Sequence, residues 1–444
     1  MMKRERVRLT QIVNPIDHSA KHGDWTAKKA RGRAGIGELR INSTLVFIIL
    51  FSAMPLVDSL NGMLIRANGS NAIGIGDVYR FFVLLASFAF FAKKIRKGFF
   101  VAFLSSAAFS LLAISVHALI GLGGGAFSEF NLVVQWLFAP ILTLSLYTAI
   151  RNNVIRANAV ISVLNILKWL APLTILVPYF LNVGYSTYGA SDGSFVGYKA
   201  FYYANNGISL MLIALFAWTA YLVFQKKTPS NFFTLLLNGC ALALIGTKSS
   251  LLMLILSFFI VIYSLYGDRL LKLLGKGIMV IIVAAVLLFA FSSAIYDFLF
   301  PILDRWAFFS TKVYGDDILS ALTSGRVDLL PVYWEIMLSA KNSFLAIVFG
   351  MGDLSRIIKL CEIDYADMFF QFGLIGLLLL LSFIFYVVKK GRSSGRKRSF
   401  ALSIVIFLLV YALIVGHVFN NAMSSMVFVL FAVYAMTESE HRGA

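Results

Sequence analysis

The sequence has few charged residues and almost no cysteine, and both shortages exclude classes of protein. Only 14% of the 444 residues are charged and 59% are hydrophobic, whereas a soluble domain carries about a quarter charged residues. So little polar surface excludes a soluble enzyme and a disordered chain. The two cysteines, Cys240 and Cys361, lie in different surroundings, and the sequence has no CxxC or HExxH motif. We therefore expect no disulfide framework and no metal site.

The hydrophobic residues occur in long runs, many of them near the roughly 20 residues that a helix needs to cross a bilayer. Backbone groups in lipid must pair within the segment, so these runs predict helices. The sequence predicts an all-α polytopic membrane protein with about twelve transmembrane helices. The predicted spans are 44–62, 78–92, 99–122, 130–150, 157–181, 204–224, 231–246, 250–266, 277–295, 368–388, 399–417 and 421–437.

The net charge of +18 is distributed unequally between the two sides of the membrane. If the N-terminal tail is cytoplasmic, the inner segments contain 28 Lys+Arg and 7 Asp+Glu, and the outer segments contain 10 and 14. Basic residues concentrate in cytoplasmic loops, so both termini are predicted to be cytoplasmic. The basic loops then need no nucleic acid partner, and the lipid bilayer explains them.

The spans divide the chain into five regions. These are a basic cytoplasmic tail at 1–43, helices one to nine at 44–295, a long outer loop at 296–367, helices ten to twelve at 368–437 and a cytoplasmic C-terminus at 438–444. Loops of this length are usually functional. We expect short helices within it, including an interfacial stretch near 298–309 and a helix over 325–340 that is capped by Thr323 and Ser324.

Arg326 stands at the predicted start of that helix, after Ser324 and Gly325. An arginine at a helix N-terminus can bind phosphate through its two-pronged guanidinium group. The alternative is an ordinary capped helix in which Arg326 pairs with Asp328 or with solvent. Arg305, further upstream in the same loop, is a second candidate cation.

Three acids, Glu362, Asp364 and Asp367, precede the tenth span. Asp364 and Asp367 are three residues apart and therefore share a helix face. Carboxylates near the membrane plane suit a general base or a group that binds an acceptor hydroxyl. The alternative is a solvated cap that places negative charge at a helix N-terminus.

Further candidates lie at the outer ends of other spans, and each has a structural alternative. Tyr202, Asn205 and Asn206 enter the sixth span and suit sugar binding, or an interfacial aromatic belt. The lysines among the remaining candidates suit a phosphate, but their side chains could instead extend along the membrane to water. The one histidine lies near a turn, where a lone histidine is more often structural. The remaining candidates for substrate binding are Lys199, Lys248, Ser249 and His417.

These residues resemble the O-antigen polymerase and ligase superfamily of bacterial envelope glycan assembly. The resemblance covers about 195–435 and rests on short motifs in a fixed order. They are Tyr202 to Asn206, Thr247-Lys248-Ser249, Ser324-Gly325-Arg326, Gly350-Met351-Gly352 and Phe372-Gly373-Leu374-Ile375-Gly376. Ligases of the superfamily carry a His-Asn-type pair before the last motif, whereas this chain has Glu362-Ile363-Asp364, which resembles the polymerases that join repeat units.

The resemblance implies a metal-independent glycosyltransferase with a GT-C-like fold and no cofactor, in the bacterial inner membrane. It would polymerise undecaprenyl-diphosphate-linked oligosaccharide repeat units at the periplasmic face and so build O-antigen or exopolysaccharide. Arg326 would stabilise the diphosphate, and the acids at 362–367 would bind or deprotonate the acceptor. A flippase and a chain-length regulator would be the protein partners. The alternatives are an O-antigen ligase that transfers glycan to lipid A core, and a polysaccharide flippase or other transporter.

Overall fold

The structure is a computed structural model that describes residues 42–68, 74–92, 97–189, 195–266, 325–354, 357–392 and 399–440. The predicted ninth span at 277–295, the interfacial stretch at 298–309 and the cap at Thr323 and Ser324 lie outside these residues. The helices that match predicted spans are α1 (Ser43–Ser52), α2 (Met54–Asn68), α3 (Ile75–Ala92), α4 (Lys97–Ile120), α5 (Ala126–Arg151), α6 (Ala159–Phe180), α7 (Asn205–Gln225), α8 (Pro229–Ile245), α9 (Lys248–Tyr266), α15 (Asp364–Arg392), α16 (Phe400–Ile414) and α17 (Ala422–Glu440).

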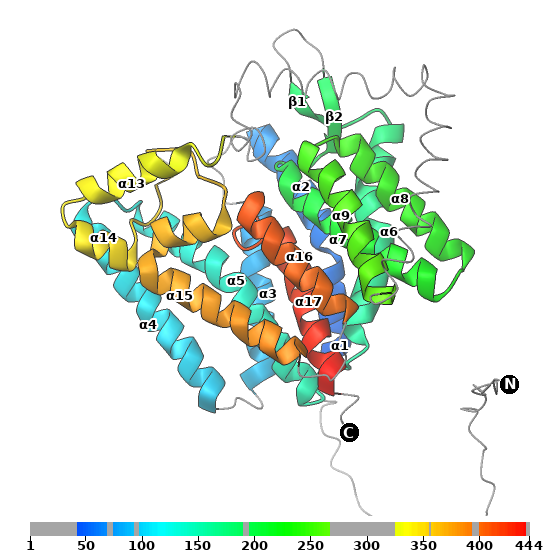
Figure 1. Ribbon diagram of the computed structural model, residues 1–444, viewed down its shortest axis with the longest axis horizontal. Coiled ribbons are helices and arrows are strands. Elements are labelled where there is room, and N and C mark those ends of the chain that lie inside the picture. The colour runs from blue at the N-terminus through cyan, green and yellow to red at the C-terminus, as the bar shows by residue number, and fades with distance from the viewer. Residues whose placement is uncertain are drawn as a thin grey trace, which may run out of the picture. The chain divides into compact units, whose positions relative to one another are not determined.

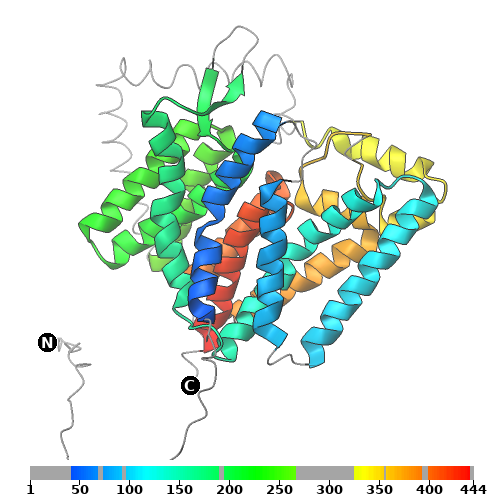
Figure 2. The same cartoon turned by 180° about the vertical axis from the view of Figure 1, so that it is seen from behind.

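Five of these helices, α4, α5, α6, α7 and α15, are long and apolar enough to cross a membrane. The first predicted span is a pair of helices, because α1 and α2 meet at an angle of 43° next to Pro55, and together they make a sixth candidate. Figure 2 shows this pair in dark blue. A membrane protein built mainly of helices is therefore confirmed, whereas a total of twelve spans stays a prediction.

The core lies around α17, which packs against α5, α7, α15 and α16 (Figure 1). Most of its side chains from Met426 to Met436 have no exposed surface, so its apolar character extends around the whole helix. By contrast, only 28% of the residues from Phe103 to Ile120 of α4 are buried. That helix presents leucines such as Leu104 and Leu111 outward, as expected of a helix that faces lipid.

One hairpin departs from the predicted all-α fold. Strands β1 (Tyr185–Gly189) and β2 (Phe195–Ala200) pair antiparallel, with Ser186 opposite Tyr198. The hairpin packs on the end of α8, where the Thr187 hydroxyl donates to the Ile245 carbonyl at 2.8 Å. Gly197 allows this approach, because its φ is +73° and a Cβ there would lie 2.3 Å from the Ile245 oxygen.

The described part of the long loop contains α13 (Leu329–Ser339) and α14 (Ser343–Phe349). The helix predicted over 325–340 is therefore present but begins at Leu329, so its predicted start was wrong. Tyr333 and Met337 of α13 pack with Phe370 of α15 in a separate apolar cluster. This cluster places the loop helices over the N-terminal end of α15 (Figure 1).

Two ends of the helical bundle are named below by their charge. The acidic end carries Glu362 and Asp364, and the basic end carries Arg151, Lys389 and Lys390.

Candidate functional site at the acidic end

Arg326 and Glu362, 36 residues apart in the chain, form a partly buried ion pair at the acidic end. The guanidinium Nε and Nη2 donate to the same oxygen, Glu362 Oε2, at 3.2 and 2.9 Å. The Nε2 atom of His417 lies 3.5 Å from that oxygen. The side chains are 13%, 24% and 19% exposed, so solvent can still reach the cluster. Arg326 and Glu362, both predicted to be catalytic, and His417, predicted to bind substrate, are therefore joined at Glu362 Oε2.

The backbone that carries this cluster is held in an unusual conformation. Glu362 and His417 have φ values of +62° and +64°, although neither is glycine. Such left-handed residues persist only where the surroundings enforce them, and they are concentrated at functional sites. Gly416 lies between the two segments, and a Cβ there would be 1.9 Å from the Glu362 carbonyl oxygen. The sequence at 416 therefore lets the two loops touch.

The charge state of Glu362 follows from its neighbours. Burial raises its pKa, but the hydrogen bond and charge of His417 and the charges of Arg326 and Lys359 outweigh burial and lower the pKa to about 2. Next to it, burial and the nearby Asp367 raise the pKa of the Cys361 thiol to about 12. Glu362 is thus a fixed anion in this arrangement, and Cys361 is an inert neutral thiol whose Sγ contacts the Arg326 carbonyl.

Asp364 is completely buried and holds the loop that carries His417. Its two carboxylate oxygens accept hydrogen bonds from the backbone N–H groups of His417, Val418 and Phe419, at 2.8, 2.7 and 3.1 Å. Asp367, one turn later, is 1% exposed, and neither carboxylate oxygen makes a hydrogen bond within the described part of the chain. A solvated cap is excluded for both. In this arrangement Asp364 positions His417, and its predicted role as a base stays untested.

Two glycine motifs meet just behind the site. Helix α15 is interrupted at Gly373, whose φ and ψ are +67° and −167°. The carbonyls of Phe370 and Gln371, on the turn before this break, accept hydrogen bonds from the N–H groups of Met351 and Gly352 at 2.8 and 3.0 Å. A Cβ at Gly350 would lie 2.2 Å from the Gln371 carbonyl oxygen. The Gly-x-Gly motif at 350–352 therefore packs against the backbone just before and at Gly373 of the Gly-x-x-Gly motif. This contact fixes the first turns of α15.

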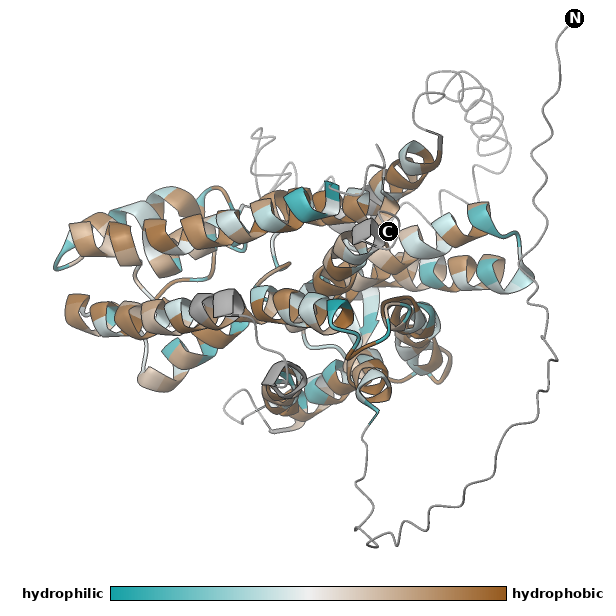
Figure 3. Cartoon of the chain, turned by 90° about the horizontal axis from the view of Figure 1, so that it is seen from below, coloured by the Kyte–Doolittle hydropathy of each residue, from teal (hydrophilic) through white to brown (hydrophobic). Residues whose placement is uncertain are grey.

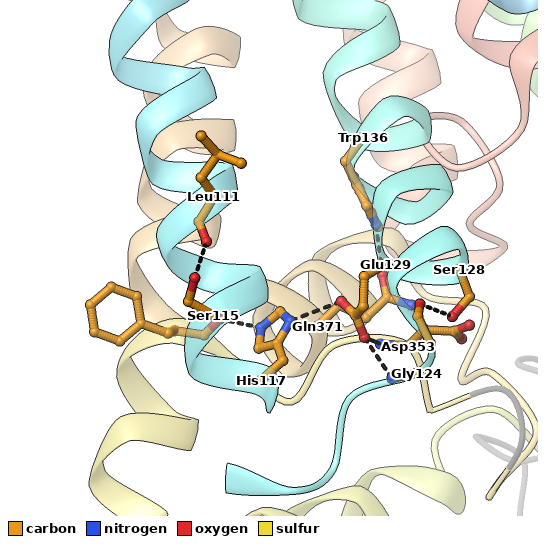
Figure 4. Close-up of polar contacts among 11 residues, drawn as sticks. Leu111, Ser115, His117, Gly124, Ser128, Glu129, Trp136, Asp353 and Gln371 are labelled. Atoms are coloured by element: carbon orange, nitrogen blue, oxygen red, sulfur yellow. Dashed lines mark hydrogen bonds and ion pairs between the residues drawn. The ribbon is translucent and has the colours of Figure 1, made fainter. Parts of the chain in front are cut away.

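A buried polar cluster next to this contact was not predicted from the sequence (Figure 4). Glu129 at the start of α5 is 2% exposed. It accepts hydrogen bonds from the N–H groups of Gly124 and Asp353, at 2.7 and 2.8 Å, and faces His117 Nδ1 at 2.9 Å. The other ring nitrogen of His117 faces the Phe349 carbonyl at 3.0 Å. Acids and histidines inside apolar helices are a signal that could have identified this cluster.

A second unpredicted group lies where α3 approaches α5 and α17. Arg80 Nη1 donates to Asp77 at 3.0 Å, and its side chain borders a very small cavity with Gln135 and Ala422. Asp58 of α2 is 9% exposed, and its Oδ1 makes no hydrogen bond among the described residues. In the sequence, Asp77 and Arg80 only interrupt a hydrophobic run. The structure places Arg80 beside the helix that follows the His417 loop.

The candidates near the sixth predicted span have mainly structural contacts. Tyr202 is 1% exposed, and its hydroxyl bonds Thr174 and the Pro55 carbonyl at 2.6 and 3.0 Å, so it is unavailable for sugar stacking. Lys199 Nζ donates to the Tyr203 carbonyl at 2.9 Å, and burial lowers its pKa. Asn205 and Asn206 begin α7 and are partly exposed.

Three further candidates lie wholly or partly outside the described residues. Arg305 lies outside the described residues, and the side chains of Lys248 and Ser249 are not described, although their backbone begins α9. Among the described residues, no group of three or more His, Cys, Asp or Glu side chains could hold a metal ion. The organised part of the site is therefore the cluster of Arg326, Glu362, Asp364 and His417.

Comparisons with known proteins add no identification. No family model matches the chain, and no match is found among curated proteins or among solved structures.

Proposed function

We propose that this chain is a membrane glycosyltransferase that polymerises polyprenyl-diphosphate-linked oligosaccharide repeat units. The reaction would take place on the outer face of the bacterial cytoplasmic membrane and build O-antigen or exopolysaccharide. The observation that carries the proposal is the convergence of Arg326 and His417 on one oxygen of Glu362. A cation, a carboxylate and an imidazole held together at the solvent-accessible end of an apolar bundle suit transfer from an anionic lipid leaving group to a hydroxyl.

The proposed reaction exchanges one bond for another at the first sugar of the growing chain. The acceptor hydroxyl oxygen forms a bond to the anomeric carbon while the bond from that carbon to the diphosphate oxygen breaks. The bonding electrons leave with the diphosphate, which Arg326 would stabilise through its planar donors. The hydroxyl proton passes to the Glu362 carboxylate.

The ion pair also suggests how the base is activated. With a pKa of about 2, Glu362 is a weak base while Arg326 is bound to it. When a diphosphate attracts the guanidinium group away, the carboxylate loses one of the charges that lower its pKa, beside the larger effect of His417, so the pKa of Glu362 rises. Substrate binding would therefore convert a fixed anion into a competent base only when the leaving group is present.

The polarity of the bundle supports transfer over transport. The cation, acids and imidazole of the site come together at one end. The intramembrane lysine, Lys168, is 7% exposed, and its Nζ bonds Asn231 at 3.1 Å near the basic end. Its ammonium group therefore makes a buried polar contact between two helices, away from the site.

The test is polymer length in cells or proteoliposomes supplied with lipid-linked repeat units. Arg326→Ala should remove long chains, and Arg326→Lys should leave only a small fraction of activity because it lacks the two-pronged geometry. Lys341→Ala removes an exposed charge from the same loop and should behave as wild type. A normal chain-length ladder from a well-inserted Arg326→Ala protein would contradict the proposal. If the protein is a ligase, ladders will be absent and product will appear only with lipid A core as acceptor.

A further inference from the structure

A large apolar cavity lies between α4, α5 and α15, beneath the site at the acidic end. Its volume is about 570 Å³, which is within the range of about 300–1,000 Å³ for small-molecule sites. Phe109, Trp136, Phe372 and Phe383 are among the residues that line it. Nothing proposed above for sugar transfer uses this cavity.

The cavity follows from the way the three helices pack. Helix α4 packs on α5 and α14, whereas α15 packs on α14, α16 and α17. Helices α4 and α15 therefore both contact α14 near the acidic end and separate below it, as Figure 1 shows. Figure 3 shows that hydrophobic residues, in brown, predominate along the helices. The cavity is lined by α5 from Val133 to Arg151, a length of about 27 Å at 1.5 Å per residue. It therefore extends along most of the hydrocarbon thickness.

Polar groups on the wall of the cavity are already used within the protein. The hydroxyls of Ser110 and Thr148 donate to carbonyls of their own helices at 2.8 Å. The Trp136 indole N–H donates to Gln371 Oε1 at 2.6 Å, which satisfies the polar group nearest the acidic end. The surface that remains is hydrocarbon and aromatic, so the matching occupant is a hydrocarbon chain.

The basic end of the same cavity is different. Arg151, at the last turn of α5, lines the cavity together with Ser382 and Tyr386 of α15. Lys389 and Lys390 follow in the last turn of α15. The cavity is therefore amphipathic, with an apolar length and a cationic end at the membrane surface. An anionic phospholipid has the same polarity and is abundant in the bilayer around it.

We propose that this cavity binds one acyl chain of an anionic phospholipid, with the lipid phosphate at Arg151 and the chain directed toward Trp136. The proposal is independent of the glycosyltransferase function, because the bound lipid belongs to the leaflet at the basic end and is not the substrate. The lipid would fill the space where α15 separates from α4 and would stabilise the position of α15 beneath the catalytic cluster.

The test is lipid retention by the full-length chain, purified in detergent, exchanged against equal amounts of phosphatidylglycerol and phosphatidylcholine and measured by native mass spectrometry. Wild type should retain phosphatidylglycerol in preference by about fivefold, the ratio expected from one favourable basic contact at the surface. Arg151→Gln should lose the preference and still bind a chain. Ser110→Trp, which fills the cavity, should lose retention of both lipids. Ser115→Trp, at an exposed position of the same helix, should behave as wild type.

Two results would overturn the proposal. One is an unchanged preference for phosphatidylglycerol in Arg151→Gln, which does not depend on whether Ser110→Trp folds. The other is retention of a polyprenyl phosphate, added as a third lipid, in place of phosphatidylglycerol. That result would assign the cavity to the lipid carrier, with its head group at the opposite end.

Discussion

Gly416 lies directly against the backbone of Glu362. A Cβ at position 416 would be 1.9 Å from the Glu362 carbonyl oxygen and 2.7 Å from its carbonyl carbon, and Gly416 has a φ of +71°. Both the space and the backbone conformation therefore require glycine. This contact joins the segment before α15 to the loop between α16 and α17, and it is the reason that His417 can face Glu362.

Gly416→Ala should separate the two segments. We expect a loss of about 3 kcal/mol or more of stability from strain and steric overlap, together with loss of polymer formation. Gly239→Ala is the matched control, because Gly239 lies in α8, and outside that helix the nearest atom to an added Cβ is 3.6 Å away on Phe216. That change should preserve activity and stabilise the helix by about 0.5–1 kcal/mol. Melting temperature in detergent and polymer length measure both effects, and equal behaviour of the two variants would contradict the assigned role of Gly416.

The contacts of Glu362 with His417 and Arg326 predict a specific dependence of stability on pH. Because folding lowers the pKa of Glu362 from 4.5 to about 2, its contribution is fully present above the unfolded value and is lost as the pH falls toward 2. The difference in melting temperature between wild type and Glu362→Gln should therefore be largest at pH 6 and shrink between pH 5 and pH 3. Using the difference removes the contribution of other carboxylates. A difference that stays constant over this range would show that Glu362 is not stabilised as an anion.

The positions of the helices were largely predictable, because hydropathy alone identifies apolar helices of this length. The predicted span 157–181 and the observed helix Ala159–Phe180 agree within two residues at each end. The hairpin Tyr185–Ala200 was missed because two short strands outside the membrane leave no long apolar run. Proline at position 55 divides the first span, and hydropathy averaged over a window does not detect a bend.

The site was only partly predictable. Glu362 and His417 were recognisable as polar residues at the outer ends of apolar runs, and Arg326 was recognisable as a cation at the start of a predicted helix in the long loop. Their convergence depends on contacts across 36 and more residues, through a left-handed turn and a glycine contact that no local pattern specifies. Glu129 and His117 were missed because each is isolated in sequence, and only the fold places them 2.9 Å apart.

The Glu129–His117 cluster should be essential for stability. Replacing Glu129 by Gln removes the charge that faces His117 and leaves one oxygen where Gly124, Asp353 and His117 now share two. Breaking a buried pair of this kind costs about 3–5 kcal/mol. The control is Glu335→Gln at an exposed position of α13, which should change stability by about 0.5 kcal/mol or less. Thermal unfolding followed by size-exclusion chromatography measures both, and equal melting temperatures would show that the cluster does not hold α4, α5 and the loop at 350–353 together.

The charge distribution predicts which side of the membrane each end faces, and two exposed lysines can test it. Lys341 lies in the loop at the acidic end and Lys227 follows α7 at the basic end. In a background where Cys240 and Cys361 are replaced by serine, Lys341→Cys should react in intact cells with a thiol reagent that cannot cross the inner membrane. Lys227→Cys should react only after the membrane is permeabilised, because basic segments remain in the cytoplasm. The reverse pattern would place the Arg326 cluster in the cytoplasm, where the proposed periplasmic polymerisation could not occur.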